Sequence, residues 1–328
     1  MHCPMRASRD LSSAVGGDGL MQDAMYDVII IGGGAAGLTA GIYTCRAGLK
    51  TLMLERLMPG GQVINAERIE NFPGFPEGLA GADFGPLLQQ QAMQYGLEIQ
   101  LGEVDELEQE TDGWRVSAWG TEHRSRSIII AGGSTLRRLG VPGEEELFGA
   151  GVSYCATCDG GFFMNQVVGV VGGGDSALDE ALVLTEYASK VLLLHRSAAF
   201  SGENILQERV LAHPKIEVRW NTTVREIIGS GQVEGVGVVD ALSGETSRID
   251  LSGIFIYIGL DPNTEYLQDV IPLDNGGHIP TDIWMSTPVP GIFAVGDIRQ
   301  NSAAQLVSAA GDGATAAIAA RRYVEGLR

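Results

Sequence analysis

The sequence contains few cysteines, few basic residues and no long apolar run. Only four of its 328 residues are cysteine, which argues against a disulfide-stapled scaffold and for a reducing compartment. Lysine and arginine total 22 against 41 acidic residues, and the net charge of −19 makes nucleic acid and anionic membranes poor partners. The apolar runs are far shorter than the ~20 residues that span a bilayer. We therefore expect a globular cytoplasmic protein without a transmembrane segment.

The first 24 residues lack the apolar stretch of a secretory signal peptide. They are rich in serine, glycine and aspartate, which predicts a disordered tail over residues 1–24. Cys3 lies in this tail, and Met21 and Met25 leave the start of the biological chain open. The length of the chain is typical of two domains.

Glycine, in contrast, is abundant, and it marks a unit of strand, turn, helix and strand. The β-branched run at residues 26–31 predicts a buried parallel strand. It is followed by a glycine turn at 32–37, a helix to about residue 46, and a second strand at 50–54 that ends in Glu55. This order predicts a βαβ dinucleotide-binding unit.

The same unit recurs later in the chain, with the same internal spacing. Glu55 follows Gly32 by 23 residues, and His195 follows Gly172 by 23 residues. We therefore predict an α/β protein with two Rossmann-like, three-layer dinucleotide-binding domains. The second unit consists of a strand at 167–171, a glycine turn at 172–177, a helix to about 187 and a strand at 190–194.

Each glycine of the first turn has a physical role. Gly32 permits the tight turn, Gly34 lets the backbone approach a pyrophosphate, and Gly37 packs the helix against the strand. The helix N-terminus then faces the phosphates, and Glu55 accepts hydrogen bonds from ribose hydroxyls, which favours FAD or NAD. The candidate residues are Gly32, Gly34, Ala35, Ala36, Gly37 and Glu55 for the first cofactor, and Gly172, Gly174, Asp175, Ser176, Ala177, His195 and Arg196 for the second cleft.

A third glycine-rich element lies near the C-terminus. Residues 292–295 predict a strand, followed by Gly296 and Asp297. A helix of small residues, opened by residues 309–314, is then able to pack closely against a cofactor.

Cys155 and Cys158 form the only close pair of cysteines, separated by Ala156 and Thr157. The spacing favours a redox pair, because the two thiols can form a small reversible ring. A metal site is disfavoured, since no second CxxC or paired histidine spacing accompanies it. Asp159 is placed to manage protons during disulfide exchange. Cys45 lies in the first predicted helix and is interpreted as a small core residue.

Taken together, these motifs resemble the low-molecular-weight thioredoxin reductases over residues 25–328. The motifs are GGGAAG with Glu55, MPGGQ at 58–62, NFPGFP at 71–76, CATCDG at 155–160, GGGDSA at 172–177 and GIFAVGD at 291–297. The resemblance implies a discontinuous FAD-binding domain, residues 21–136 and 262–328. An NAD(P)-binding-like domain, residues 137–261, is inserted into it and carries the disulfide.

The resemblance also implies the roles of individual residues. Cys158 is expected to face the flavin, Cys155 to attack the partner disulfide, and Asp159 to act as acid and base. It further implies a homodimer, a thioredoxin-like thiol or disulfide partner, and a swing of one domain during turnover. The additional cofactor-binding residues on matching motifs are Gly61, Gln62, Asn71, Gly296, Asp297, Gln305 and Leu306.

The chain departs from the family where the 2′-phosphate of NADPH binds. NADPH-using members read His-Arg-Arg-x-x-x-Arg, whereas this chain continues after Arg196 with Ser197 and Ser201 at the other two arginine positions. Each lost charge-assisted bond costs on the order of 1.5–3 kcal/mol. Specific binding of NADH is not indicated either, because it favours an acidic residue where His195 stands. Ala35, Gly133, Ser134 and Ala304 also depart from the family pattern near the flavin.

Three functions follow from this combination. Our main expectation is an FAD-dependent disulfide oxidoreductase with weak or no NADPH use. Its electrons then come from a second FAD in the altered cleft, or they flow in the reverse direction, from a dithiol substrate to the flavin. Ferredoxin ranks lower as a donor because both proteins are acidic. The alternative is a conventional NADPH-dependent thioredoxin reductase. The second alternative is a non-catalytic flavoprotein with a regulatory CxxC. The sequence leaves the electron donor, the direction of flow and the thiol substrate open.

Overall fold

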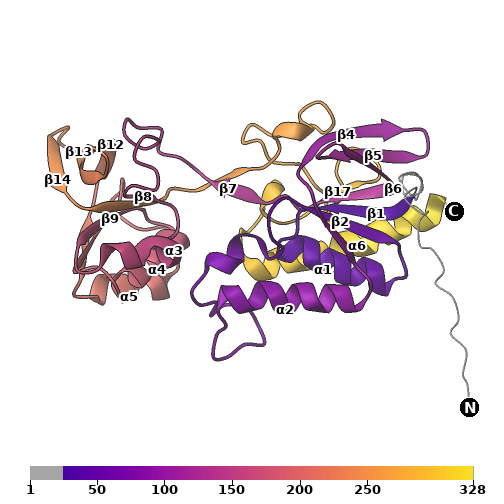
Figure 1. Ribbon diagram of the computed structural model, residues 1–328, viewed down its shortest axis with the longest axis horizontal. Helices are drawn as coiled ribbons and strands as arrows, with labels where there is room; N and C mark the ends of the chain where they lie inside the picture. Colours follow the sequence, from indigo (N-terminus) through magenta and orange to yellow (C-terminus); the bar gives the residue numbers. More distant parts are fainter. Residues whose placement is uncertain (1–24, 328) are drawn as a thin grey trace, which may run out of the picture.

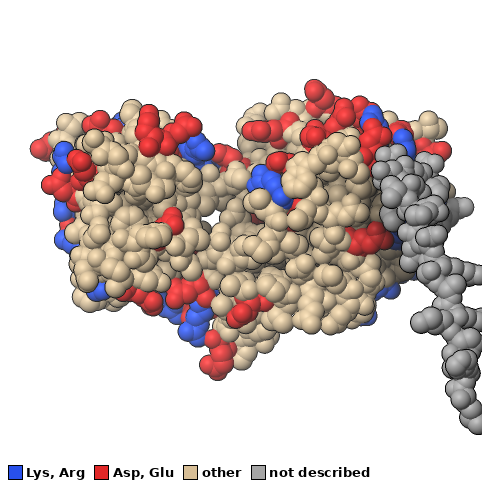
Figure 2. Space-filling view, viewed as in Figure 1, with Lys and Arg blue, Asp and Glu red and all other residues tan. Residues whose placement is uncertain are grey.

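The computed structural model describes residues 25–327 and consists of two lobes joined by two extended segments (Figure 1). The predicted disordered tail, with Cys3, lies outside the described residues. No described helix is long and apolar enough to cross a membrane. On the face shown in Figure 2, acidic side chains lie along the outer edges of both lobes, and basic side chains form no continuous patch there.

The first lobe is built on a seven-stranded sheet that two distant parts of the chain complete. Its path runs β3-β2-β1-β6-β5-β4, and β17 pairs in parallel with β6. Because β17 comes from near the C-terminus, the sheet is finished only after the chain has returned from the second lobe. The strands are β1 (Tyr26–Ile31), β2 (Thr51–Glu55), β3 (Glu98–Leu101), β4 (Val104–Glu110), β5 (Gly113–Ala118), β6 (Thr121–Ile130) and β17 (Ile292–Ala294).

Three helices cover one face of this sheet: α1 (Ala35–Arg46), α2 (Gly81–Gln94) and α6 (Leu306–Leu327) (Figure 1). Small residues let α1 and α6 approach closely, and a Cβ added to Gly313 would lie 2.1 Å from the Ala36 oxygen. The sheet supplies the core, where Ile29, Ile30 and Ile128 are fully buried. Short 3₁₀ turns complete the lobe: η1 (Gly61–Asn65), η3 (Glu265–Leu267) and η4 (Gly296–Ile298).

The two lobes are connected by an antiparallel pair of short strands, β7 (Ser134–Leu136) and β16 (Leu260–Pro262). Leu260 pairs with Leu136, and Pro262 pairs with Ser134. The domain boundaries predicted after residues 136 and 261 fall at these strands. The division of the chain into domains at these residues stays a prediction.

The second lobe holds a parallel five-stranded sheet in the order β11-β10-β9-β15-β8. A separate antiparallel sheet of three strands packs beside it. The five strands are β8 (Val152–Ser153), β9 (Val167–Gly172), β10 (Lys190–Leu194), β11 (Ile216–Arg219) and β15 (Gly253–Tyr257), and the three are β12 (Thr222–Gly229), β13 (Val233–Asp240) and β14 (Thr246–Asp250). The helical segments are α3 (Ala156–Asp159), η2 (Gly160–Phe163), α4 (Asp175–Leu184) and α5 (Asn204–Ala212).

The elements of both predicted units are present, with shifted ends. The predicted strands agree with β1, β2, β9, β10 and β17 to within one residue at each end. The helix after the second turn ends at Leu184, because residues 185–187 form a turn. The C-terminal helix begins at Leu306, three residues before the predicted opening at 309.

Candidate functional site

The first glycine turn has the backbone geometry that a dinucleotide requires. Gly32 has a φ of +103°, and a Cβ there would lie 2.4 Å from the Ala131 oxygen. A Cβ on Gly37 would lie 2.0 Å from the Gly32 oxygen. At Gly34, by contrast, the nearest atom to an added Cβ is 3.9 Å away, so this position opens toward free space. The first two glycines bring helix and strand together, and Gly34 leaves room for a ligand.

The N-terminus of α1 and the carboxylate of Glu55 face the same space. Gly34 is the N-cap of α1, and no side chain caps the helix. The first amide groups of the helix are therefore available to an anion. Glu55 accepts hydrogen bonds from the amides of Gly33 at 2.6 Å and Leu57 at 2.9 Å. A carboxylate has about four lone-pair sites, so it can still accept from ribose hydroxyls.

These groups line a cavity of about 1030 Å³ in the first lobe. Gly37 and Asn71 do not line it: Gly37 packs under the turn, and the Asn71 amide donates to Gln305 Oε1 at 3.1 Å. The predicted residues that do line the cavity are Gly32, Gly34, Ala35, Ala36, Glu55, Gly61, Gln62, Gly296, Asp297, Gln305 and Leu306.

Sequence reasoning missed part of the cavity wall. The segment 134–138 and residues Asn263 and Tyr266 line the cavity, and the β7–β16 pairing brings these segments together. Arg137 forms an ion pair with Asp261 at 2.7 Å there. The sequence pointed to this part of the wall only through Gly133 and Ser134, which depart from the family pattern.

Asp297 lies in the wall where the third glycine element ends. Burial raises the pKa of the Asp297 carboxyl, and a hydrogen bond from the Ser302 hydroxyl opposes that shift. The neighbouring Asp312 is also buried, but Arg299 holds it with bonds of 2.6 and 3.1 Å. The described residues include no group of three or more histidine, cysteine or acidic side chains placed to hold a metal ion.

The cavity fits FAD on three structural grounds. The glycine turn forms a cradle that a side chain would fill, the N-terminus of α1 is uncapped, and Glu55 retains acceptor capacity at the end of β2. The volume is at the upper end of the range of about 300–1,000 Å³ found for ligand cavities. Gly34 and the N-terminus of α1 would hold the diphosphate of FAD, and Glu55 would accept from its ribose.

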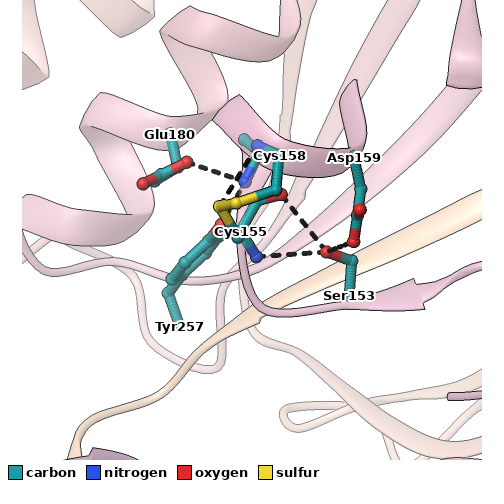
Figure 3. The surroundings of a disulfide bond; sticks show 7 residues. Ser153, Cys155, Cys158, Asp159, Glu180 and Tyr257 are labelled. Carbon is teal, nitrogen blue, oxygen red and sulfur yellow. Dashed lines mark hydrogen bonds between the residues drawn. A yellow bond between two sulfur atoms is a disulfide. The ribbon is translucent and has the colours of Figure 1, made fainter. Parts of the chain in front are cut away.

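Cys155 and Cys158 form a disulfide with an S–S distance of 2.07 Å (Figure 3). Cys158 is exposed, and Cys155 is partly buried as the N-cap of α3. The Cys158 amide donates to Cys155 Sγ at 3.1 Å. On one side of the pair, the Ser153 hydroxyl donates to Asp159 Oδ2 at 2.7 Å, so Ser153 orients the predicted acid and base.

The disulfide does not line the FAD cavity in this arrangement of the lobes. Neither cysteine is among the residues that line the cavity, and the role of Cys158 toward the flavin stays a prediction. The second glycine turn lies beside the cavity instead, because Gln305 Nε2 donates to Asp175 Oδ2 at 3.3 Å. Arg209 of α5 also contacts Glu70 of the first lobe at 2.8 Å.

The second glycine turn repeats the geometry of the first. Gly172 has a φ of +151°, and a Cβ there would lie 2.6 Å from the Ala177 Cβ. His195 closes the turn, with Nδ1 2.8 Å from the Gly172 oxygen and Nε2 2.9 Å from the Ala199 oxygen. Gly174 is the N-cap of α4 and has no side-chain cap. Ser176 and Arg196 are exposed.

Two Rossmann-like units, one inserted into the other, with a cysteine pair beside the second, define a two-lobed disulfide oxidoreductase. The family model described as pyridine nucleotide-disulphide oxidoreductase matches residues 26–313. The chain is 46% identical over 308 residues to a thioredoxin reductase of Listeria monocytogenes, covering 94% of this chain and 96% of that protein. It is 44% identical over 310 residues to a thioredoxin reductase of Bacillus subtilis, with coverages of 94% and 98%.

Solved structures agree with this relationship. The thioredoxin reductase of Lactococcus lactis in its FR conformation has a TM-score of 0.90 and 43% identity, over 92% of this chain and 99% of that one. The chain thus belongs to the pyridine nucleotide-disulphide oxidoreductase family, among its thioredoxin reductases. The predicted family, fold class and enzyme class are confirmed. The comparisons favour the conventional alternative over our main expectation, and they give no support to weak NADPH use or to a second FAD.

Proposed function

We propose that this protein is a conventional thioredoxin reductase, which passes electrons from a pyridine nucleotide through FAD and the Cys155–Cys158 disulfide to a thioredoxin-like protein. The observation that carries the proposal is the position of the second glycine turn, which contacts the wall of the FAD cavity through Asp175 and Gln305. A nucleotide on this turn lies next to the flavin site. The names of the relatives support the same activity.

In this proposal, FAD supplies two-electron exchange between a nucleotide hydride and a disulfide. The residues of the chain carry out the thiol–disulfide exchange and the proton transfers. Two electrons and two protons convert Cys155–Cys158 to two thiols, and Asp159, held by Ser153, delivers a proton to one sulfur. Cys155 then loses its proton and its thiolate attacks the partner disulfide, so that one partner sulfur leaves and takes up a proton. Cys158 loses its proton in turn and attacks Cys155 Sγ of the mixed disulfide, which restores the Cys155–Cys158 bond and releases the partner as a dithiol.

The choice of nucleotide depends on the second cleft. Each ring nitrogen of His195 faces a backbone carbonyl, so the ring has no free nitrogen to offer a phosphate. The Ser201 amide donates to the Gly173 oxygen at 2.9 Å. Arg196 is exposed and is the one clamp arginine present. We therefore propose that the enzyme uses NADPH with less preference over NADH than a full three-residue clamp confers.

A second candidate, a nucleotide-independent disulfide oxidoreductase, is favoured only by the replacement of two of the three clamp arginines, by Ser197 and Ser201. The intact geometry of the turn at Gly172 argues against it. We also propose a homodimer working in the cytoplasm, supported by the family resemblance and the low cysteine content. Light scattering of the FAD-loaded protein tests the dimer.

Turnover of oxidised thioredoxin with NADPH and with NADH tests the proposed function. We expect Cys158→Ser to lose thioredoxin reduction while the nucleotide still bleaches the flavin. Cys45→Ser is the matched control, because Cys45 is a free, half-buried cysteine on α1, and it should retain turnover. Thioredoxin reduction by Cys158→Ser at the wild-type rate overturns the assignment. Activity with dithiols but with neither nucleotide favours the second candidate.

A further inference from the structure

Glu180 lies beside the disulfide on the opposite side from Ser153 and Asp159 in Figure 3. Its Oε2 accepts a hydrogen bond of 3.0 Å from the amide of Ala156, the first residue of α3. The Tyr257 hydroxyl accepts from the same amide, also at 3.0 Å. The peptide group between Cys155 and Ala156 is therefore held by side chains from α4 and β15.

We propose that Glu180 is a positioning residue for the redox pair, which fixes the peptide after Cys155 and opposes formation of a thiolate on Cys155. The proposal rests on the proposed function only in taking Cys155 and Cys158 as the redox pair. Two-electron reduction breaks the S–S bond, and the two sulfurs bind either two protons as thiols or one proton as a thiol and a thiolate. A carboxylate beside Cys155 disfavours the second product, because like charges repel across the protein interior.

The charge of Glu180 changes in the pH range where thiols react. Burial raises the pKa of the Glu180 carboxyl to about 7, and the bonds from Ala156 and Tyr257 partly offset that rise. Asp179 on the same helix and Glu67 from the first lobe add repulsion. The charge of Asp159, on α3, raises the pKa of the Tyr257 hydroxyl. Repulsion of the Cys155 thiolate is therefore weak below this pH range and strong above it.

Alkylation of the reduced cysteines measures this effect without nucleotide or thioredoxin. The FAD-loaded enzyme is reduced with dithiothreitol, desalted without oxygen, and treated with iodoacetamide from pH 5.5 to 8, and labelling of Cys155 is followed by mass spectrometry. Glu180→Gln keeps an acceptor for the Ala156 amide and removes the charge. We expect the variant and the wild type to react at about equal rates at pH 5.5, and the variant to react about three- to tenfold faster at pH 7.5.

Two further variants separate charge from structure. Glu186→Gln removes an equal charge at an exposed position just after α4, and it should follow the wild type at every pH. Tyr257→Phe removes a hydrogen bond that lowers the pKa of Glu180. Glu180 should then keep its proton to higher pH, so the pH above which it slows labelling of Cys155 should rise. If the ratio of the Cys155 labelling rates of Glu180→Gln and the wild type is the same at every pH, whatever its value, the proposal is overturned. This result leaves the proposed function untouched, because turnover of thioredoxin is measured separately.

Discussion

At the scale of single residues, two tyrosine hydroxyls have opposite surroundings. The Tyr266 hydroxyl is buried without a hydrogen-bond partner among the described residues. The Tyr154 hydroxyl donates to Glu144 Oε1 at 2.5 Å. Burying an unpaired hydroxyl costs free energy, whereas a bond to a carboxylate stabilises the fold. Without FAD in the cavity that Tyr266 lines, its hydroxyl therefore lowers the stability of the protein, whereas that of Tyr154 raises it.

The same substitution at these two sites should change the free energy of unfolding in opposite directions. We expect Tyr266→Phe to raise it by about 1 kcal/mol and Tyr154→Phe to lower it by about 1–2 kcal/mol. Chemical denaturation of both variants after removal of FAD measures the difference, because Tyr266 lines the FAD cavity. A loss of stability in Tyr266→Phe similar to that in Tyr154→Phe contradicts this account.

Glu180 should make stability depend on pH. Its pKa of about 7 in the folded protein lies above the value of 4.5 for an unperturbed glutamate. The folded state therefore holds the proton more tightly, and stability falls as pH rises from about 4.5 to about 7. We expect Glu180→Gln to unfold like the wild type at pH 4.5 and to gain up to about 3 kcal/mol at pH 8. Equal effects at both pH values would show that the carboxyl does not titrate in this range.

Residues within local motifs were predictable, and residues that act across the fold were not. The side chains of Glu55 and His195 end strands at fixed distances from glycine turns, and the structure places both beside those turns. Glu180 and Tyr257 stand 25 and 102 residues after Cys155 in the sequence. Only the packing of α4 and β15 against α3 brings them to the disulfide.

At the scale of elements, the second glycine turn should accept a restored phosphate clamp. We expect Ser197→Arg with Ser201→Arg to strengthen NADPH binding at least about tenfold, because each new guanidinium adds a charge-assisted bond to the 2′-phosphate. NADH lacks that group, so its affinity should change little. Binding of both nucleotides is measured by calorimetry, with Ser197→Ala and Ser201→Ala as the control. No gain for NADPH would mean that the geometry around His195, rather than the missing charge, limits the cleft.

The βαβ units were predictable because each depends on local rules. A β-branched run must be buried, and a glycine with positive φ, such as Gly32, must follow it for the turn to form. The β4–β5 hairpin and the β12–β14 sheet were not predicted. Both consist of local antiparallel hairpins with glycine at positive φ in or beside their turns, at Gly113, Gly231 and Gly244. These turns can be read from the sequence, but the segments carry no chemical motif and no prediction was drawn from them.

At the scale of the whole molecule, polar contacts join the described parts of the two lobes, from Arg209 to Glu70 and from Gln305 to Asp175. The Arg209–Glu70 ion pair is exposed, with about 45% of each side chain accessible. Exposed ion pairs contribute about 0–1 kcal/mol. Such a contact permits the lobes to separate, and the swing of one domain during turnover stays a prediction.

A cross-link between the lobes should stop turnover without stopping flavin reduction. The cross-link joins Glu70→Cys to Arg209→Cys by a cleavable bis-maleimide, in a Cys3→Ser, Cys45→Ser background with the Cys155–Cys158 disulfide intact. We expect the cross-linked enzyme to be reduced by nucleotide but to lose thioredoxin reduction. Cleavage of the linker should restore turnover. Full turnover of the cross-linked protein would show that the lobes need not move. The relative position of the lobes was not predictable, because no local pattern encodes it.

The central claim is that electrons enter from a pyridine nucleotide and leave through the disulfide. An anaerobic titration of the FAD-loaded enzyme with NADPH, and separately with NADH, tests it through the absorbance of the flavin. We expect stoichiometric bleaching of the flavin by NADPH and recovery of the colour on addition of oxidised thioredoxin. A flavin that neither nucleotide bleaches, although dithiothreitol reduces it through the cysteines, would contradict it.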